Sequence, residues 1–117
     1  MLIRSASGLR GIAKDHFTPE LIDKYISAFI NTQNIKSCVI GRDGRPSGKQ
    51  IALWVIDSLH KKGVNVDNCG LATTPTMQIM TEKENYDGGI VITASHNPSE
   101  YNGLKFLQND GTFLSPE

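Results

Sequence analysis

The sequence predicts an α/β domain with three layers, α/β/α, in which helices cover both faces of a mixed, mainly parallel sheet that ends in a C-terminal β-hairpin. Two observations support this fold class. Short apolar runs alternate along the chain with segments whose apolar residues recur at helical spacing. Towards the end, the turn signals Asn102-Gly103 and Asn109-Asp110-Gly111 flank a run that can fold back on itself.

Two long helices open with capping signals. Thr18 offers a side-chain oxygen to the first turn and Pro19 suits the first helical position, so we expect a helix from about Pro19 to Thr32. Apolar residues recur at helical spacing across this range. Ser47 and Gln50 have the spacing of a capping box, which predicts that a second helix begins there and ends near residue 63.

The remaining elements are shorter. Residues 37–41 form a brief apolar run that predicts a buried strand, and residues 64–66 alternate as a strand does. Thr74-Pro75 repeats the cap-plus-proline signal and predicts a short third helix. Residues 89–93 are a β-branched run too short for a helix, which predicts the most buried strand of the sheet.

The C-terminal stretch predicts a hairpin and then a further element. Residues 104–107 can pair with residues 112–114 as the two arms of a hairpin beside Ser95. Residues 115–117 have the pattern of a capping serine, a first helical proline and an acid. We therefore expect another helix to follow, and residues 1–117 to be one N-terminal α/β domain of a longer multidomain protein.

Composition narrows the function classes. A chain of 117 residues suits one domain that folds without metals or disulfides. Its 12 Lys and Arg residues balance 12 Asp and Glu residues, and this zero net charge argues against a nucleic-acid partner. No apolar run approaches the ~18 residues of a membrane-spanning helix, so we expect a cytoplasmic protein with no membrane partner. Cys38 and Cys69 lie in or beside apolar runs and are expected to be reduced thiols.

Three loops are candidates for a ligand site, because ligands of such sheets bind beyond the carboxyl ends of the strands. They are residues 7–11, 41–48 and 93–98. The second loop is glycine-rich, but Gly44 and Gly48 are one residue too close for the phosphate-binding pattern G-x-x-x-x-G-K-[ST]. We expect an arginine-bearing turn instead, with Arg42 and Asp43 as a structural ion pair.

The third loop carries Ser95 beside His96, a pair that invites comparison with hydrolases in which a histidine activates a serine. Neighbouring side chains on an extended backbone point to opposite sides, and no G-x-S-x-G elbow surrounds the serine. A serine that carries a group transferred from elsewhere needs no such dyad.

Together these segments resemble one family. Residues 93–98 (Thr-Ala-Ser-His-Asn-Pro), followed by residues 101–103 (Tyr-Asn-Gly) and Lys105, resemble the phosphoserine loop of the α-D-phosphohexomutases, which include phosphoglucomutase, phosphomannomutase and phosphoglucosamine mutase. Residues 7–11 resemble the family's opening S-G-I-R-G segment, and residues 41–48 resemble its G-R-D-x-R-x-S-G turn. The resemblance spans the whole chain.

The resemblance implies an intramolecular phosphotransferase that interconverts hexose 1-phosphate and hexose 6-phosphate. Ser95 would carry a phosphoryl group, donate it to the free hydroxyl of the sugar phosphate, and take the other phosphate back from the bound 1,6-bisphosphate, which also serves as activator. A Mg²⁺ ion would bind Ser95 through its phosphate and take its remaining ligands from a second domain. The implied partners are a hexose phosphate and the other domains of the enzyme, so residues 1–117 alone are expected to be inactive.

Seven residues are expected to form the site. Phosphoryl transfer needs cations near the moving group, which favours an arginine and a lysine beside the serine. A histidine is a further acid or base, because its unperturbed pKa lies near neutrality. The predicted catalytic residues are Ser95, His96, Lys105 and Arg10. The residues predicted to bind substrate or phosphate are Ser7, Asn97 and Asn102.

Several alternatives stay open. Lys105 could be a solvated lysine, Arg10 could fix the N-terminal loop, and His96 is as well suited to orient its loop as to move a proton. The chain could also be a stand-alone phospholigand-binding or regulatory module with the same fold. The sugar stays open among glucose, mannose and glucosamine phosphates, because the segment that discriminates them in the family lies in a later domain.

Overall fold

The fold is described from a computed structural model, which places residues 3–5 and 8–114. The helices are α1 (Ala13–His16), α2 (Pro19–Gln33), α3 (Gly48–Lys61) and α4 (Thr74–Lys83), and the strands are β1 (Ile3–Ser5), β2 (Gly8–Ile12), β3 (Ser37–Arg42), β4 (Asn65–Leu71), β5 (Gly88–Ile92) and β6 (Tyr101–Leu107). The two long predicted helices and the predicted strands at 37–41 and 89–93 are therefore confirmed to within two residues at each end.

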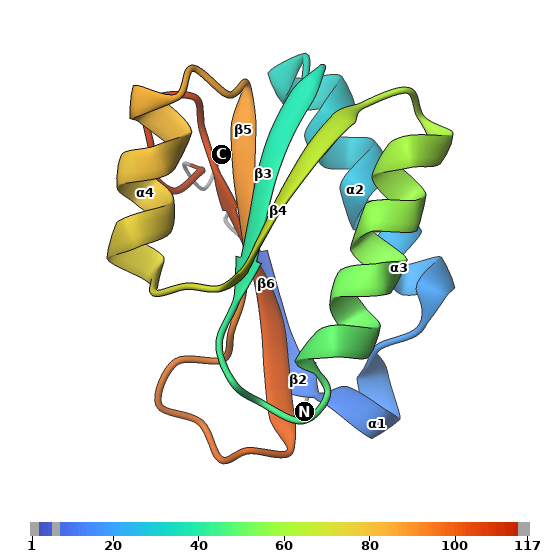
Figure 1. The fold of residues 1–117 in the computed structure, drawn as a ribbon. Coiled ribbons are helices and arrows are strands. Elements are labelled where there is room, and N and C mark those ends of the chain that lie inside the picture. The colour runs from blue at the N-terminus through green and yellow to red at the C-terminus, as the bar shows by residue number, and fades with distance from the viewer. Residues whose placement is uncertain (1–2, 6–7, 115–117) are drawn as a thin grey trace.

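A six-stranded sheet of the described residues forms the middle layer, in the order β1-β2-β6-β5-β3-β4. Strand β3 pairs in parallel with β4 and β5, whereas the β1-β2, β2-β6 and β5-β6 pairs are antiparallel. Helices α1, α2 and α3 lie on one face of the sheet and α4 lies on the other (Figure 1). The three-layer fold with a mixed sheet is confirmed, and parallel pairing is confined to the strands that α3 and α4 connect, because parallel neighbours need a crossover.

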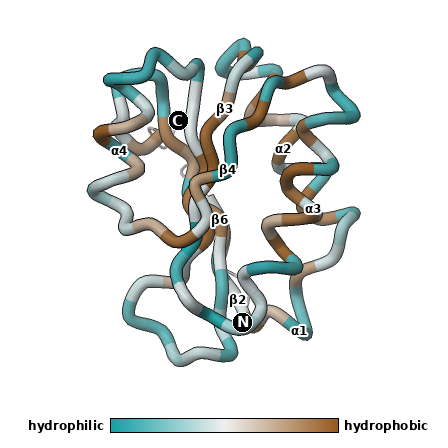
Figure 2. The backbone as a smooth tube through the Cα atoms, in the orientation of Figure 1, coloured by the Kyte–Doolittle hydropathy of each residue, from teal (hydrophilic) through white to brown (hydrophobic). Residues whose placement is uncertain are grey.

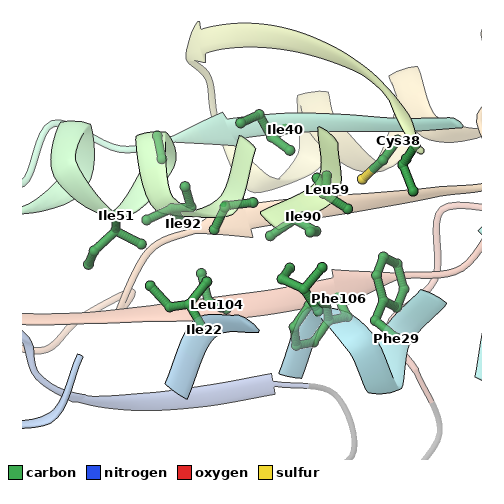
Figure 3. Packing of buried hydrophobic residues seen from close by; sticks show 14 of the residues in the cluster. Ile22, Phe29, Cys38, Ile40, Ile51, Leu59, Ile90, Ile92, Leu104 and Phe106 are labelled. Atoms are coloured by element: carbon green, nitrogen blue, oxygen red, sulfur yellow. The ribbon is translucent and has the colours of Figure 1, made fainter. Parts of the chain in front are cut away.

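Alternate residues of the central strands face two apolar cores. Ile40 of β3 packs into the larger core, under α2 and α3, whereas Val39 packs with Met77 of α4 on the opposite face. In the larger core, the rings of Phe29 and Phe106 lie 4.8 Å apart between centroids (Figure 3). Hydrophobic stretches follow the central strands and the helices, whereas the loops at the lower end of the sheet are mostly hydrophilic or neutral (Figure 2). The loops at the upper end are also mostly hydrophilic, so polar loops lie at both ends of the apolar strands and helices (Figure 2).

The segment near the N-terminus differs from the prediction. Residues 8–11 are expected to lie in a loop, but they belong to β2, which pairs antiparallel with β6 and places Arg10 opposite Gly103. Residues 8–12 carry no strand-like alternation, and it is their pairing with β1 and with the distant β6 that makes them a strand. This pairing brings the N-terminal motif beside the segment that follows the serine loop.

The capping predictions have mixed outcomes. Thr18 caps α2 as expected, since its Oγ1 accepts a backbone N–H of the first turn at 3.1 Å. Ser47 does not cap α3, and the predicted capping box is wrong. Its φ and ψ of −76° and −10° are helical, whereas a capping side chain needs an extended backbone, and its Oγ accepts from Asn102 instead. The cap of α4 is Thr73 rather than Thr74.

The C-terminal hairpin forms in a short version. Leu107 and Phe113 make one isolated antiparallel bridge, and the backbone N–H of Gln108 donates to the carbonyl of Thr112 at 2.8 Å. Strand β6 uses its length to pair with β2 and β5 instead, which leaves the second arm without a ladder. The helix start predicted at residues 115–117 lies outside the described residues.

Both cysteines are free thiols, as predicted. Burial raises the pKa of the Cys38 thiol and of the half-buried Cys69 thiol, which keeps both in the protonated form. Across residues 3–5 and 8–114, no helix is both long and apolar enough to cross a membrane.

Candidate functional site

The β3–α3 turn and the loop after β5 meet at the lower end of the sheet (Figure 1). Both follow the carboxyl ends of neighbouring parallel strands, which the α/β fold places side by side. The backbone N–H of Asp43 donates to the carbonyl of Ile92 at 3.1 Å, and Arg45 donates from Nη2 to the carbonyl of Ser95 at 2.6 Å. Two of the three predicted ligand-site loops are therefore in direct contact.

Ser95 follows the end of β5 and has an unusual backbone conformation. Its φ is 54°, in the left-handed region that residues other than glycine seldom adopt. Its backbone N–H donates to Thr93 Oγ1 at 3.0 Å, and the residue is exposed. The backbone is thus not extended at Ser95, whereas the sequence-based argument against a Ser95–His96 dyad expects an extended backbone there. A left-handed serine in an exposed loop is a conformational cost of the kind that clusters at functional sites.

The partner of the Ser95 hydroxyl is Lys105, on β6. Lys105 donates from Nζ to Ser95 Oγ at 2.7 Å. The antiparallel register of β5 and β6 sets Val91 opposite Lys105, and the Nζ atom lies 5.6 Å from the centroid of the Phe113 ring. Burial lowers the pKa of Lys105, and the positive charge of Arg10 lowers it further. The serine hydroxyl therefore faces an amine whose hold on its proton is weakened.

Arg10 reaches the same region from β2. Its Nε is buried and, within residues 3–5 and 8–114, it is the one buried side-chain nitrogen or oxygen without a hydrogen-bond partner. A buried donor left unpaired costs free energy, and an anion would satisfy it. Because the charge of Arg10 also disfavours the ammonium of Lys105, an anion beside the two would relieve their repulsion.

Removing the charge of Arg10 is expected to raise the pKa of Lys105. The Arg10→Gln variant loses the repulsion that disfavours the ammonium, so Lys105 keeps its proton to a higher pH, while burial still holds its pKa below the ordinary value. Competitive acylation of the neutral amine, followed by peptide mapping across a pH series, measures this change. The labelling midpoint of Lys105 should move to higher pH, and an unchanged midpoint would contradict the coupling.

Two further predicted residues share the serine loop. His96 is exposed and Asn97 is half-buried, and both follow Ser95 directly in the chain. Their roles stay predictions. Ser7, the remaining residue expected to bind phosphate in the N-terminal motif, lies outside the described residues.

Asn102 has a different environment. It is fully buried, its Nδ2 donates to Ser47 Oγ at 2.9 Å, and its Oδ1 accepts the backbone N–H of Gly103 at 2.9 Å. The first of these bonds joins β6 to the start of α3, and the second lies within β6. The burial favours a role in holding the two segments together over the predicted contact with a ligand.

The β3–α3 turn contains an ion pair whose arginine differs from the predicted one. The expected pair of Arg42 with Asp43 is wrong, because Asp43 Oδ2 pairs with Nε of Arg45 at 3.0 Å. The Oδ1 atom of Asp43 accepts the backbone N–H of Arg45, a local turn that carries the guanidinium round to the carboxylate, whereas Arg42 donates to the carbonyl of Asp43. Asp43 and Arg45 were absent from the predicted site, although both are fixed letters of the G-R-D-x-R resemblance.

Ser95 does not line either of two hollows that lie near its loop. One, of about 550 Å³, is lined largely by apolar side chains that include Phe17, Ile51 and Trp54, and these offer few donors to a phosphate. Another, of about 360 Å³, lies between Asp43 and Asn97. Ser95 lines neither of these two hollows, and the residue is exposed.

Comparison with known protein families accounts for this arrangement. The family described as "Phosphoglucomutase/phosphomannomutase, alpha/beta/alpha domain I" matches residues 1–117, the whole chain. The chain belongs to this family. The resemblance of the chain to the phosphohexomutases is thereby confirmed at the level of the family.

Curated relatives of this phosphohexomutase domain share about two fifths of its residues. A phosphoglucomutase/phosphomannomutase of Thermococcus kodakarensis is 43% identical over 94% of this chain, which covers 25% of that protein. A phosphoglucosamine/phosphogalactosamine mutase of Sulfurisphaera tokodaii is 41% identical over 94% of the chain and 24% of that protein. The chain thus spans about a quarter of the length of these relatives.

A solved structure shares the fold of this phosphohexomutase domain. The crystal structure of a candidate phosphomannomutase from Thermus thermophilus superposes with a TM-score of 0.85 at 26% identity. The match covers 97% of this chain and 27% of the other. The layers and the mixed sheet are therefore those of a phosphohexomutase domain I.

Proposed function

We propose that this chain is the phosphoserine-bearing domain of a phosphohexose mutase, in which Ser95 donates and takes back the phosphoryl group. The observation that supports the proposal most directly is the exposed hydroxyl of Ser95, held in a left-handed backbone conformation at 2.7 Å from the Nζ of Lys105. The membership in domain I of the phosphohexomutases supplies the reaction class.

Lys105 is suited to exchange a proton with the serine oxygen. When the phosphoryl group moves to a sugar hydroxyl, the bond from phosphorus to Ser95 Oγ breaks and a bond to the sugar oxygen forms. The serine oxygen gains negative charge, which the ammonium of Lys105 stabilises and can neutralise with a proton. On the return, a neutral Lys105 accepts the hydroxyl proton as Ser95 attacks the other phosphate of the bisphosphate. The lowered pKa of Lys105 makes the neutral form accessible.

Two groups complete the local chemistry in this proposal. Arg10 brings a planar guanidinium to the oxygens of the moving phosphoryl group, and its buried Nε has no hydrogen-bond partner among residues 3–5 and 8–114. His96 is exposed beside Ser95 and could accept the proton of the sugar hydroxyl, while Asn97 could contact the phosphate.

Magnesium, which the family resemblance implies, has only a partial site in this domain. Among residues 3–5 and 8–114, no group of three or more His, Cys, Asp or Glu side chains could hold a metal ion. The phosphate on Ser95 would be the contribution of this domain, and the carboxylates that a hard cation prefers would come from another domain. The ion would supply positive charge that offsets the charge of the phosphate.

Because Ser95 is exposed, other parts of the enzyme would have to enclose the substrate. Ser95 is exposed, and the curated relatives are about four times as long as this chain. We propose a hexose monophosphate as substrate, with its 1,6-bisphosphate as intermediate and activator. The choice among glucose, mannose and glucosamine phosphates belongs to the other domains, and the isolated domain should be inactive.

The experiment that tests this proposal maps phosphate on the full-length protein. Intact mass and peptide mapping are measured on the purified protein and again after incubation with a hexose 1,6-bisphosphate. We expect one phosphoryl group, on Ser95, which is discharged when a hexose monophosphate is added. A Ser95 that stays unmodified under both conditions would sink the proposal and leave the alternative, a module that only binds a phosphorylated ligand.

A further inference from the structure

We propose that Arg45 is a positioning residue that holds Ser95 in its left-handed conformation and thereby keeps its hydroxyl at Lys105. The inference rests on the proposed function of Ser95. Arg45 lies in the β3–α3 turn, some fifty residues before the serine in sequence, and its side chain is only 10% exposed. It contacts the backbone of the serine loop rather than any reacting atom.

The guanidinium of Arg45 gathers the carbonyl groups of the serine loop. Its Nη2 donates to the carbonyl of Ser95 at 2.6 Å, and its Nη1 donates to those of Asn97 at 2.8 Å and Pro98 at 2.7 Å. A longer bond of 3.3 Å reaches Tyr101, where β6 begins. One cation therefore ties together both ends of the loop, from the serine to the next strand.

Asp43 links the same guanidinium to the amide side of the serine. Its Oδ2 accepts from Nε of Arg45 at 3.0 Å and from Oγ1 of Thr93 at 2.6 Å. Thr93 Oγ1 accepts in turn the backbone N–H of Ser95 at 3.0 Å. The N–H and the carbonyl of the serine peptide are thus both bonded to one network, which fixes the two sides of the residue with positive φ.

Only an arginine can make this set of bonds. A guanidinium presents five N–H donors in a planar fork, so Nε can bind the carboxylate while both terminal nitrogens bind carbonyls. A lysine would supply the charge with a single nitrogen, which cannot lie at hydrogen-bond distance from Asp43 and from the carbonyls of Ser95 and Pro98 at once. Since the left-handed region is unfavourable for serine, a loosened loop would let the backbone relax and carry Oγ away from Lys105.

The test compares Arg45→Lys with the wild type in the full-length protein. We expect kcat for hexose phosphate turnover to fall about 10²-fold with KM changed by less than about twofold, because the nucleophile is misplaced while the sugar-binding parts are intact. Hydrogen–deuterium exchange of the peptide that spans residues 95–101 should become at least about tenfold faster. Thermal unfolding establishes that the variant is folded.

The matched control is Arg42→Lys. Arg42 is the last residue of β3, three residues before Arg45, and its side chain donates to the carbonyl of Asp43 and not to the serine loop. The kcat of the Arg42→Lys protein and the rate of hydrogen–deuterium exchange of its residues 95–101 should stay within about twofold of the wild type. If Arg45→Lys does not fold, Thr93→Val cuts the network at the serine amide and should give the same pair of effects.

The exchange measurement separates this inference from the proposed function. Unchanged exchange across residues 95–101 in a folded Arg45→Lys protein overturns the positioning role, whether or not the wild type is a mutase. Faster exchange with a wild-type kcat overturns it as well, because the hold on the loop would then be only structural. If the wild-type protein has no mutase turnover but residues 95–101 still exchange faster in Arg45→Lys, the proposed function of Ser95 is overturned. The role of Arg45 in holding the serine loop is then supported.

Discussion

Replacing Ser95 with alanine in the full-length protein is expected to lower mutase turnover by about 10⁴-fold or more. The reason is that the phosphoryl group then has no oxygen on which to move, whereas the substrate can still bind. Lys105 loses the hydroxyl that lies 2.7 Å from its Nζ and cannot replace it as the carrier. Turnover of glucose, mannose and glucosamine phosphates, measured with bisphosphate present, checks the activity, and mass spectrometry checks that phosphate uptake is lost as well.

A glycine at the same position is the matched control for folding. The φ of 54° is costly for alanine and nearly free for glycine, so Ser95→Gly should be more stable than Ser95→Ala by about 1 kcal/mol, while both are inactive. Urea unfolding of the two variants measures the difference. Retained turnover in either variant would show that another residue carries the phosphate, and equal stability would argue against the left-handed conformation.

Local sequence signals predicted the elements that depend on neighbouring residues. The β-branched run before Ser95 becomes the fully buried strand β5, and the cap and proline at Thr18 and Pro19 start α2 as expected. In both cases the residues that decide the structure lie within a few positions of one another. The end of a buried parallel strand also indicated the location of the serine loop, because that fold class gathers its loops there.

Features that depend on contacts between residues far apart in the sequence could not be predicted from local patterns. Residues 8–12 form a strand that pairs along its whole length with β6, some ninety residues later, and only in part with the neighbouring β1. For the same reason Ser47 fails to cap α3, since its hydroxyl accepts from Asn102 on β6. The partner of Asp43 was misassigned because adjacent charges suggest a pair, whereas the turn geometry favours Arg45 two residues on.

Within the predicted site, too, some contacts follow from a local motif, whereas other roles depend on the rest of the fold. The contact of Lys105 with Ser95 follows from a motif in which both residues belong to one loop and strand, and the structure brings them together. Asn102 belongs to that motif as well, but its amide is used inside the fold. A motif therefore indicates which residues matter without separating those that meet a ligand from those that shape the loop. Arg45 is a residue of the second kind.

Gly103→Ala is expected to destabilise the domain by about 3 kcal/mol, because β2 and the serine loop approach this residue too closely for a side chain. A Cβ at Gly103 would lie 2.6 Å from the carbonyl oxygen of Leu9 and 2.9 Å from that of Thr93. Both are backbone atoms, which cannot swing aside as the end of a flexible side chain can. Urea unfolding of the 117-residue chain measures the loss. The control is Gly44→Ala, where a Cβ would meet nothing within 4 Å, and its stability should stay within about 0.5 kcal/mol of the wild type.

The same substitution should also disturb the site in the full-length protein, because Gly103 lies between its two halves. It pairs with Arg10 on one side, and its carbonyl accepts the backbone N–H of Thr93 at 3.0 Å on the other. A methyl group there would push β2 and Thr93 apart, and Thr93 holds the amide of Ser95. A folded Gly103→Ala protein should therefore take up less phosphate on Ser95 than the Gly44→Ala control. A Gly103→Ala protein with the stability and the phosphate uptake of the wild type would mean that the strands can separate here without cost. It would also mean that the distance between Arg10 and the serine loop does not limit the reaction.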